Sequence, residues 1–245
     1  LIYNNLVDMY VKFGLLIDAV DIFNRSSIQD FVSWSSLIVG YSDEGLTGNV
    51  LHSLEQIELE CVTFDPVTIL FSLKAYGWLG LIDKGREMHI QLVKLGLDST
   101  SIIIGNGLMD MYVQHGNLEE ARKVFNEASV RDVVSWNLLI TAYAEFGHAE
   151  EALACLRKMQ LGGITPNVIT YTSILKVCVS IGSTESAKEI HDEIEKEGLL
   201  EKDIFIGNSL VDMYAKCGLL AKAKQVFNKL PVLSVVSWTA LIAGY

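Results

Sequence analysis

Two short strings in this chain have the residue types and spacing for metal chemistry. His148-Ala149-Glu150 and His191-Asp192-Glu193 both have the H-x-E spacing of zinc-dependent nucleobase deaminases. That zinc site also needs a P-C-x-x-C string, which is absent from the sequence, and the four cysteines have no metal-like spacing: Cys61, Cys155, Cys178 and Cys217. His191 recurs 102 residues earlier as His89, so we interpret it as a packing residue. We therefore expect no catalytic residue, no metal site and no cofactor.

A second group of polar side chains could bind a ligand through hydrogen bonds. Amides and hydroxyls stand in the middle of apolar segments, where burial without a partner would cost about 1–3 kcal/mol. They are Asn4, Ser35, Asn106, Asn137, Thr172, Asn208 and Thr239, with Leu70 in the equivalent place of one segment. Another set ends the segments and is always Asp, Asn or Ser: Asp30, Asp65, Ser101, Asp132, Asn167, Asp203 and Ser234. Helix capping explains the second set fairly well and the first set poorly, so a binding groove is the favoured interpretation.

The elements that position these side chains are repeats. Trp34, Trp136 and Trp238 are separated by the same 102 residues, and the string Asp8-Met9-Tyr10 returns at the same interval. Each 102-residue period contains three shorter repeats of 35, 36 and 31 residues, each with a glycine about fifteen residues in. Self-similarity at such periods predicts stacked structural repeats that bury a core between neighbours.

The predicted repeats form a single array over residues 1–245. Their ranges are 1–30 (partial), 31–65, 66–101, 102–132, 133–167, 168–203, 204–234 and 235–245 (partial). The polar side chains then fall at the fifth and the last residue of each repeat. Because the chain opens one residue inside a 31-residue repeat and stops midway through a first helix, we expect both ends to be fragment boundaries.

Each repeat has the periodicity of two helices. In the repeat 133–167, apolar residues recur at helical intervals before and after Gly147, and the glycine suits a left-handed bend. A small residue recurs one turn into the second helix, at Ala19, Ala121, Ala152, Ala187 and Ala223, with Gly85 and the larger Val50 in the same place. The pattern predicts an all-α, right-handed superhelical α-solenoid of about seven helix-turn-helix repeats.

Several strings resemble the pentatricopeptide repeat family of plant organelles. Gly207-Asn208-Ser209-Leu210-Val211-Asp212-Met213-Tyr214-Ala215-Lys216-Cys217-Gly218 and Val133-Val134-Ser135-Trp136-Asn137 are close to the family consensus, and the match covers essentially the whole chain. The alternation of 35, 36 and 31 residues resembles the subclass built from P, L and S motifs. Tetratricopeptide repeats, the nearest competitor, keep a uniform length of 34 residues and are disfavoured.

The resemblance implies sequence-specific binding of single-stranded RNA, one base per repeat, read by the fifth and the last residue. In the family the second residue of each repeat sandwiches a base, and here these are Leu1, Val32, Val67, Ile103, Val134, Ile169, Phe205 and Val236. From periodicity alone, ordinary core packing is an equal explanation for them. Lys12 and Lys216, matching Gln114, stand where the family contacts phosphate. The family code gives U-G-n-U-Y-(G)-C, in which Leu70 leaves one base unread.

The net charge of the chain is unfavourable for nucleic-acid binding. The net charge of −11 argues against nucleic-acid binding, which normally needs a basic surface. Many acidic residues fall on second helices, which in the family face away from RNA: Glu119, Glu120, Glu150, Glu151, Glu193, Glu195 and Glu197. We expect weak binding by this segment alone.

The resemblance implies the specificity part of an RNA-editing (C-to-U) or RNA-processing factor in the mitochondrion or chloroplast. Deamination would come from a C-terminal domain or a recruited partner, and editing-complex accessory proteins are the other expected partners. No apolar run reaches the ~18 residues of a membrane span, so no membrane association is expected. The alternative is a helical-repeat protein–protein interaction scaffold, whose acidic groove would suit a basic peptide.

Overall fold

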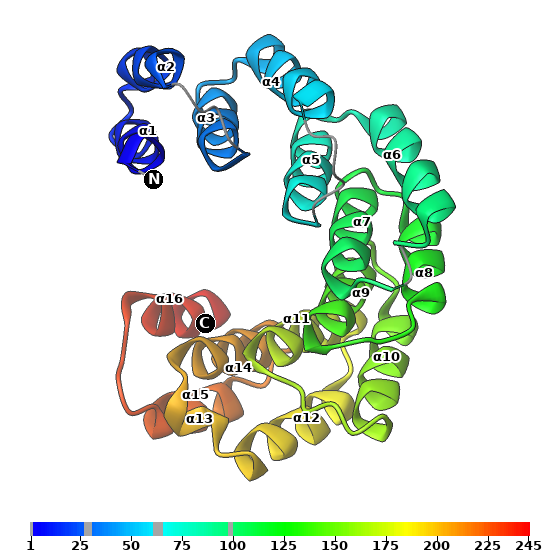
Figure 1. The fold of residues 1–245 in the computed structure, drawn as a ribbon. Coiled ribbons are helices and arrows are strands. Elements are labelled where there is room, and N and C mark those ends of the chain that lie inside the picture. The colour runs from blue at the N-terminus through cyan, green and yellow to red at the C-terminus, as the bar shows by residue number, and fades with distance from the viewer. Residues whose placement is uncertain (1, 27–30, 61–65, 98–99) are drawn as a thin grey trace. The chain divides into compact units, whose positions relative to one another are not determined.

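The computed structural model describes residues 2–26, 31–60, 66–97 and 100–245, and within these ranges the chain is helical without a strand (Figure 1). This confirms the all-α prediction. The helices fall into two compact bodies, Leu1–Asn117 and Leu118–Tyr245. The grouping of the predicted repeats into a single array stays a prediction.

The N-terminal body contains seven described helices. They are α1 (Ile2–Lys12), α2 (Leu16–Arg25), α3 (Phe31–Asp43), α4 (Thr47–Glu60), α5 (Pro66–Leu79), α6 (Ile82–Leu95) and α7 (Ile102–Gln114). Helices α1, α3 and α5 each pack against the helix that follows, and the pairs α1–α3, α3–α5 and α5–α7 also pack against each other. The first helices of successive repeats therefore form one layer.

The C-terminal body repeats this arrangement with nine described helices. They are α8 (Leu118–Glu127), α9 (Val133–Glu145), α10 (Ala149–Leu161), α11 (Val168–Ile181), α12 (Thr184–Lys196), α13 (Leu199–Lys202), α14 (Ile204–Lys216), α15 (Leu220–Lys229) and α16 (Val235–Gly244). Helices α9, α11, α14 and α16 pack in succession, and α10, α12 and α15 pack on one side of them (Figure 1). The four-residue α13 belongs to the longer, 36-residue repeat.

Glycines form the predicted bends inside the hairpins. The backbone φ of these glycines is left-handed, from 62° at Gly182 to 78° at Gly147. An L side chain rarely adopts this conformation, which ends the first helix and turns the chain into the second.

The small residues near the start of the second helices are buried, as predicted. Ala19, Ala121, Ala152, Ala187 and Ala223 have no exposed surface. At Gly85, an added Cβ would lie 2.7 Å from the Sδ atom of Met111, so even alanine there would require the Met111 side chain to shift. Val50 is also fully buried, which shows that its own repeat leaves space for a larger residue.

The recurring tryptophans join successive repeats. Trp34, Trp136 and Trp238 pack edge-on against Phe23, Phe125 and Phe227, with ring centroids 4.4, 4.7 and 4.7 Å apart. Each phenylalanine lies on the second helix of one repeat, and each tryptophan lies on the first helix of the next. Such pairs stabilise by about 0.5–1.5 kcal/mol beyond their area burial, so the 102-residue period marks a recurring packing contact.

His191 and its counterpart His89 also pack between helices. Nδ1 of His89 lies 2.8 Å from the Tyr112 hydroxyl, and Nδ1 of His191 lies 2.9 Å from the Tyr214 hydroxyl. Burial lowers the pKa of His191, although the nearby Glu195 carboxylate opposes the shift. The packing interpretation of His191 is therefore confirmed.

The cysteines give no further candidate site, and the described residues contain neither a metal-binding cluster nor a helix able to span a membrane. Cys155 and Cys178 are buried free thiols, and burial raises the pKa of each to about 11, whereas Cys61 lies outside the described residues. Over the described ranges, no cluster of histidine, cysteine and acidic side chains could hold a metal ion. None of the helices described here has the length and apolar character needed to cross a membrane.

Candidate nucleic-acid interface

In each repeat whose last residue is described, that residue caps the first helix of the next repeat. Backbone N–H groups at the helix start donate to side-chain oxygens of Ser101, Asp132, Asn167, Asp203 and Ser234. The donor–acceptor distance is 2.9 Å from Ser135 N to Asp132 Oδ1 and 3.2 Å from Thr170 N to Asn167 Oδ1. The capping interpretation is confirmed for this set, while Asp30 and Asp65 lie outside the described residues.

The fifth residue of the repeat 133–167 contacts the cap directly. Asn137 Nδ2 donates to Asn167 Oδ1 at 3.0 Å, and Asn137 Oδ1 accepts from Thr170 Oγ1 at 2.6 Å. The last residue of the repeat thus fixes the amide nitrogen of Asn137, and the third residue of the next repeat fixes its oxygen.

The repeat 204–234 has the same arrangement. Asn208 Nδ2 donates to Ser234 Oγ at 3.3 Å, and Asn208 Oδ1 accepts from Ser237 Oγ at 2.6 Å. The recurrence shows that the fifth residue, the last residue and the next repeat's third residue form one polar cluster. Sequence reasoning missed the third residue, although its hydroxyls recur and could have shown it: Ser33, Thr68, Ser135, Thr170 and Ser237.

The fifth residues, which are predicted to face a binding groove, differ in their exposure. Asn137 and Asn208 are only 6% and 7% exposed, and Ser35 is buried as well. The two asparagines are buried because the amide is covered by the last residue of its own repeat and by the third residue of the next repeat. Asn4, Leu70, Asn106 and Thr172 are half-buried, and Thr239 is exposed.

The hydroxyl groups at the fifth positions donate hydrogen bonds within their own helices. Ser35, Thr172 and Thr239 donate to main-chain carbonyls of their own helices at 2.9, 3.0 and 2.8 Å. Their oxygens keep lone pairs for an incoming donor.

The second residues form an exposed apolar set. Their exposed fractions run from 49% at Val134 to 70% at Phe205. The others in this set are Val32, Ile103, Ile169 and Val236, while the side chain of Val67 lies outside the described residues. Ordinary core packing does not explain side chains that stay half-exposed, so this alternative is wrong for the six residues described.

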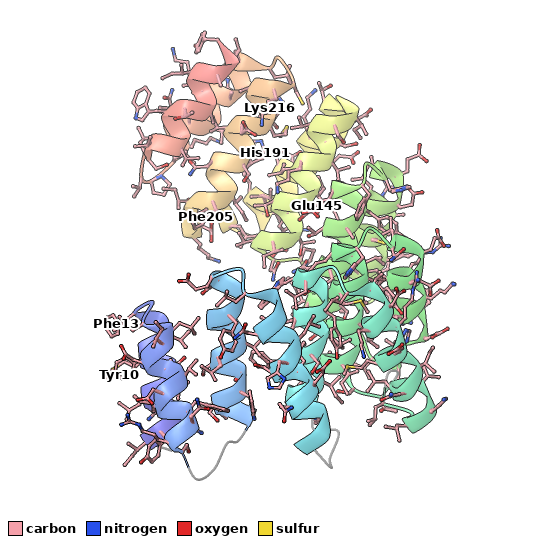
Figure 2. All side chains as sticks on the ribbon, turned by 90° about the horizontal axis from the view of Figure 1, so that it is seen from above. Tyr10, Phe13, Glu145, His191, Phe205 and Lys216 are labelled. Atoms are coloured by element: carbon pink, nitrogen blue, oxygen red, sulfur yellow. The ribbon has the colours of Figure 1, made fainter. Side chains whose placement is uncertain are left out.

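The two lysines predicted to contact phosphate are already paired. Lys12 Nζ lies 2.7 Å from Asp8 Oδ2, and Lys216 Nζ lies 2.7 Å from Asp212 Oδ2. Figure 2 labels Phe205 and Lys216 near opposite ends of α14, which places the apolar second residue and the lysine about three helical turns apart. Both lysines are solvent-exposed, so their ion pairs are weak and exchangeable.

A shallow pocket of about 230 Å³ lies between the first helices α11 and α14. Its lining comes from Thr172, Leu175, Lys176 and Val179 of α11 and from Ser209, Asp212, Met213 and Lys216 of α14. The half-buried fifth residue Thr172 therefore shares a pocket of mixed apolar and charged lining with two lysines and one aspartate.

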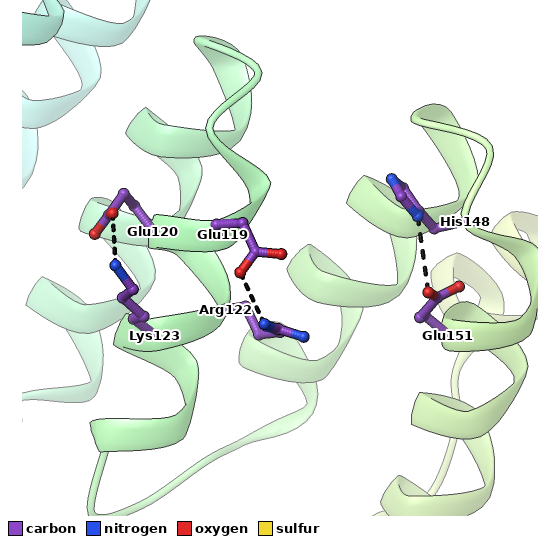
Figure 3. Close-up of polar contacts among 6 residues, drawn as sticks. All are labelled: Glu119, Glu120, Arg122, Lys123, His148 and Glu151. Atoms are coloured by element: carbon purple, nitrogen blue, oxygen red, sulfur yellow. Dashed lines mark hydrogen bonds and ion pairs between the residues drawn. The ribbon is translucent and has the colours of Figure 1, made fainter.

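Part of the acidic charge is on the second helices. On α8, Glu119 pairs with Arg122 at 2.7 Å and Glu120 pairs with Lys123 at 2.8 Å (Figure 3). At the start of α10, Glu151 lies 3.8 Å from His148 Nδ1 (Figure 3). These acids belong to the layer that does not carry the fifth residues.

Comparison with known families gives a consistent result. The model of the PPR repeat family matches residues 131–180, and the PPR repeat model matches residues 1–26, 106–133, 169–199 and 208–235. Together these matches cover more than half of the chain.

Curated relatives and solved structures agree with the family models. A chloroplastic and a mitochondrial pentatricopeptide repeat-containing protein of Arabidopsis thaliana are 33% and 34% identical over 98% of this chain. The chain spans 39% and 38% of their lengths.

The crystal structure of maize PPR10 matches 98% of this chain and 36% of PPR10, with a TM-score of 0.70 at 22% identity. A second PPR10 structure, in complex with an 18-nt psaJ RNA element, covers 99% of this chain and 37% of that one at 18% identity, also with a TM-score of 0.70. The repeated hairpins, the recurring cluster at their boundaries and these matches show that the chain belongs to the pentatricopeptide repeat family.

Proposed function

We propose that the chain binds single-stranded RNA in a sequence-specific manner, with one base per repeat read by the fifth and last residues. The observation that carries the proposal is the contact between Asn137 and Asn167, repeated between Asn208 and Ser234. These polar pairs recur in the same layer as the exposed apolar second residues. The solved complex of PPR10 with RNA supports the same class of ligand.

The amides keep hydrogen-bonding capacity for a base. An asparagine amide has two N–H donors and two acceptor lone pairs on its oxygen. Asn137 uses one donor toward Asn167 and one lone pair toward Thr170, so one of each stays for a base edge. Because protein partners fix the amide plane beforehand, binding loses less side-chain entropy.

The exposed second residues supply contacts that are independent of sequence. A base has two apolar faces, and the side chains of Val134, Ile169, Phe205 and Val236 offer apolar walls in successive repeats. In this proposal the apolar walls contribute affinity and the polar pairs choose the base.

The chain acts by positioning a transcript in the mitochondrion or chloroplast, as the specificity part of an RNA-editing or RNA-processing factor. Chloroplastic and mitochondrial relatives of similar identity support the organelle location. The alternation of 35, 36 and 31 residues, which resembles the P, L and S motifs, supports the editing role. Deamination in this proposal is supplied by another region or by a partner, and accessory proteins complete the complex.

The proposal can be tested by changing the base read by one repeat. Asn208 with Ser234 implies C, whereas an Asn with Asp implies U, so Ser234→Asp should move the preferred base of this repeat from C to U. The variant should fold, because Asp caps helices as well as Ser does and a carboxylate can accept the Asn208 amide proton. Binding to two RNAs that differ only at this base is measured for both proteins.

A reversal of preference supports the proposal, and an unchanged preference in a variant that binds would contradict it. Absence of RNA binding by the unaltered chain, together with salt-dependent binding of a basic peptide, would favour the scaffold alternative, which the net charge of −11 suits.

A further inference from the structure

The pocket between α11 and α14 contains three charged side chains that are not equivalent. Lys216 is held by Asp212 at 2.7 Å, and this pair is close to electrically neutral. Lys176 is solvent-exposed and makes no ion pair within the described part of the chain. The uncompensated positive charge of this pocket is therefore that of Lys176.

Lys176 shares a helix face with the residues proposed to bind RNA. Ile169, Thr172 and Lys176 are separated by three and four residues, so they follow one another along the same side of α11. Lys176 lies one turn beyond Thr172, the residue proposed to read the base. If an RNA base meets Thr172, a lysine placed there is on the side from which a neighbouring phosphate would be contacted.

The same lysine recurs in the other 36-residue repeat. Lys74 precedes Lys176 by 102 residues and lies on α5, one turn beyond Leu70. The ninth residue is an acid in the 31-residue repeats, at Asp8, Asp110 and Asp212, and is uncharged in the 35-residue repeats, at Val39 and Thr141. A cation at this place is thus a feature of the 36-residue repeats alone.

We propose that Lys74 and Lys176 are phosphate contacts of the RNA-binding face, one in every third repeat. This inference rests on the proposed function and adds the residues that hold the RNA backbone. An unpaired lysine gains the full effect of counterion release when it meets a phosphate. A paired lysine such as Lys216 would have to leave Asp212, and the freed carboxylate would then repel the phosphate. The Leu70 side chain cannot hydrogen-bond, so its repeat would leave one base unread. A contact between Lys74 and the RNA backbone would hold the strand at that base.

The salt dependence of RNA binding tests this proposal. For single strands, the slope of log affinity against log salt falls by about 0.7 for each phosphate contact removed. Lys176→Gln should therefore reduce the slope by about 0.7 and weaken binding about fourfold at 0.15 M salt, and Lys74→Gln with Lys176→Gln should reduce the slope by about 1.4. The matched control is Lys188→Gln, because Lys188 is exposed on α12, the second helix of the same repeat, and the substitution removes the same charge.

The probe is a single-stranded RNA containing U-G-n-U-Y-(G)-C, titrated with each protein at several salt concentrations. A smaller slope for Lys176→Gln than for Lys188→Gln supports the proposal. Equal slopes for the two variants, with the unaltered chain binding, would overturn it and leave the proposed function standing. No binding by the unaltered chain at any salt concentration would instead reject the proposed function, and the inference with it.

Discussion

Asn137 is held at a repeat boundary and is proposed to read a base, so its replacement by alanine should have two separable effects. The substitution removes the hydrogen bonds to Asn167 and Thr170, at 3.0 and 2.6 Å. Each such bond contributes about 0.5–1.5 kcal/mol net. The Thr170 hydroxyl already lies 3.1 Å from Asn167 Oδ1 and can donate there instead, which recovers part of the loss. We expect the free energy of unfolding to fall by about 1–2 kcal/mol.

The second effect is on RNA. The variant also loses the amide proposed to meet a base, which should cost about 1–3 kcal/mol of binding free energy. Thr141→Ala is the matched control, because Thr141 lies one turn further along α9 and its hydroxyl makes a 2.9 Å hydrogen bond with Ser173 across the α9–α11 interface. It should destabilise the chain by about 1 kcal/mol and leave RNA affinity unchanged.

Urea unfolding followed by circular dichroism gives the stability of both variants, and fluorescence anisotropy with a matched RNA gives their affinities. The two variants should be similar in stability and different in RNA binding. If both bind RNA as tightly as the unaltered chain, the assignment of Asn137 to base reading is refuted. If both bind equally weakly, the effect comes from the repeat interface and the same assignment fails.

Two further predictions concern packing and pH. Phe125→Ala should lower the free energy of unfolding by about 3–5 kcal/mol, measured by urea unfolding, because it removes a buried ring and its edge contact with Trp136; a change below 1 kcal/mol would contradict the packing role. Because burial lowers the pKa of His191 from its ordinary 6.5, the unfolded chain takes up that proton first as the pH falls, so stability should decline from pH 7.5 to 5.5. His191→Phe should make this decline shallower, and an equal slope in the variant would exclude His191 as a source.

The fold could be predicted because its signals repeat. Gly147 and its equivalents each mark a bend, and the 102-residue spacing of Trp34 and Trp136 locates a contact with a phenylalanine on the preceding helix. Periodicity averages over many copies, so a single exception such as Val50 does not hide the pattern. Local helix chemistry and packing then point to the same structure.

The site was harder to predict because its contacts cross repeat boundaries. The sequence shows that position 137 is an asparagine, and it does not show that Thr170, 33 residues away, donates to its oxygen. Burial of Asn137 depends on the next repeat packing over it, which residue types alone do not reveal. The pairing of Lys216 with Asp212 was open to prediction, because charges of opposite sign four residues apart meet on a helix.

If the last residue reads a base as proposed, its double contact restricts which residues can stand there. Asn167 and Ser234 accept from backbone N–H groups at the start of the next helix, and they also accept from the amide of the fifth residue. A residue at this position must therefore be a helix cap before it can be a reader. The side chains that cap well are Ser, Thr, Asp and Asn, and replacing one of them by alanine costs about 1 kcal/mol. The observed set of Asp, Asn and Ser lies inside that group. On this argument, base preference can change at the last position at little cost in stability only by exchange among these four residues, whereas the fifth position, which caps nothing, can accept Leu70.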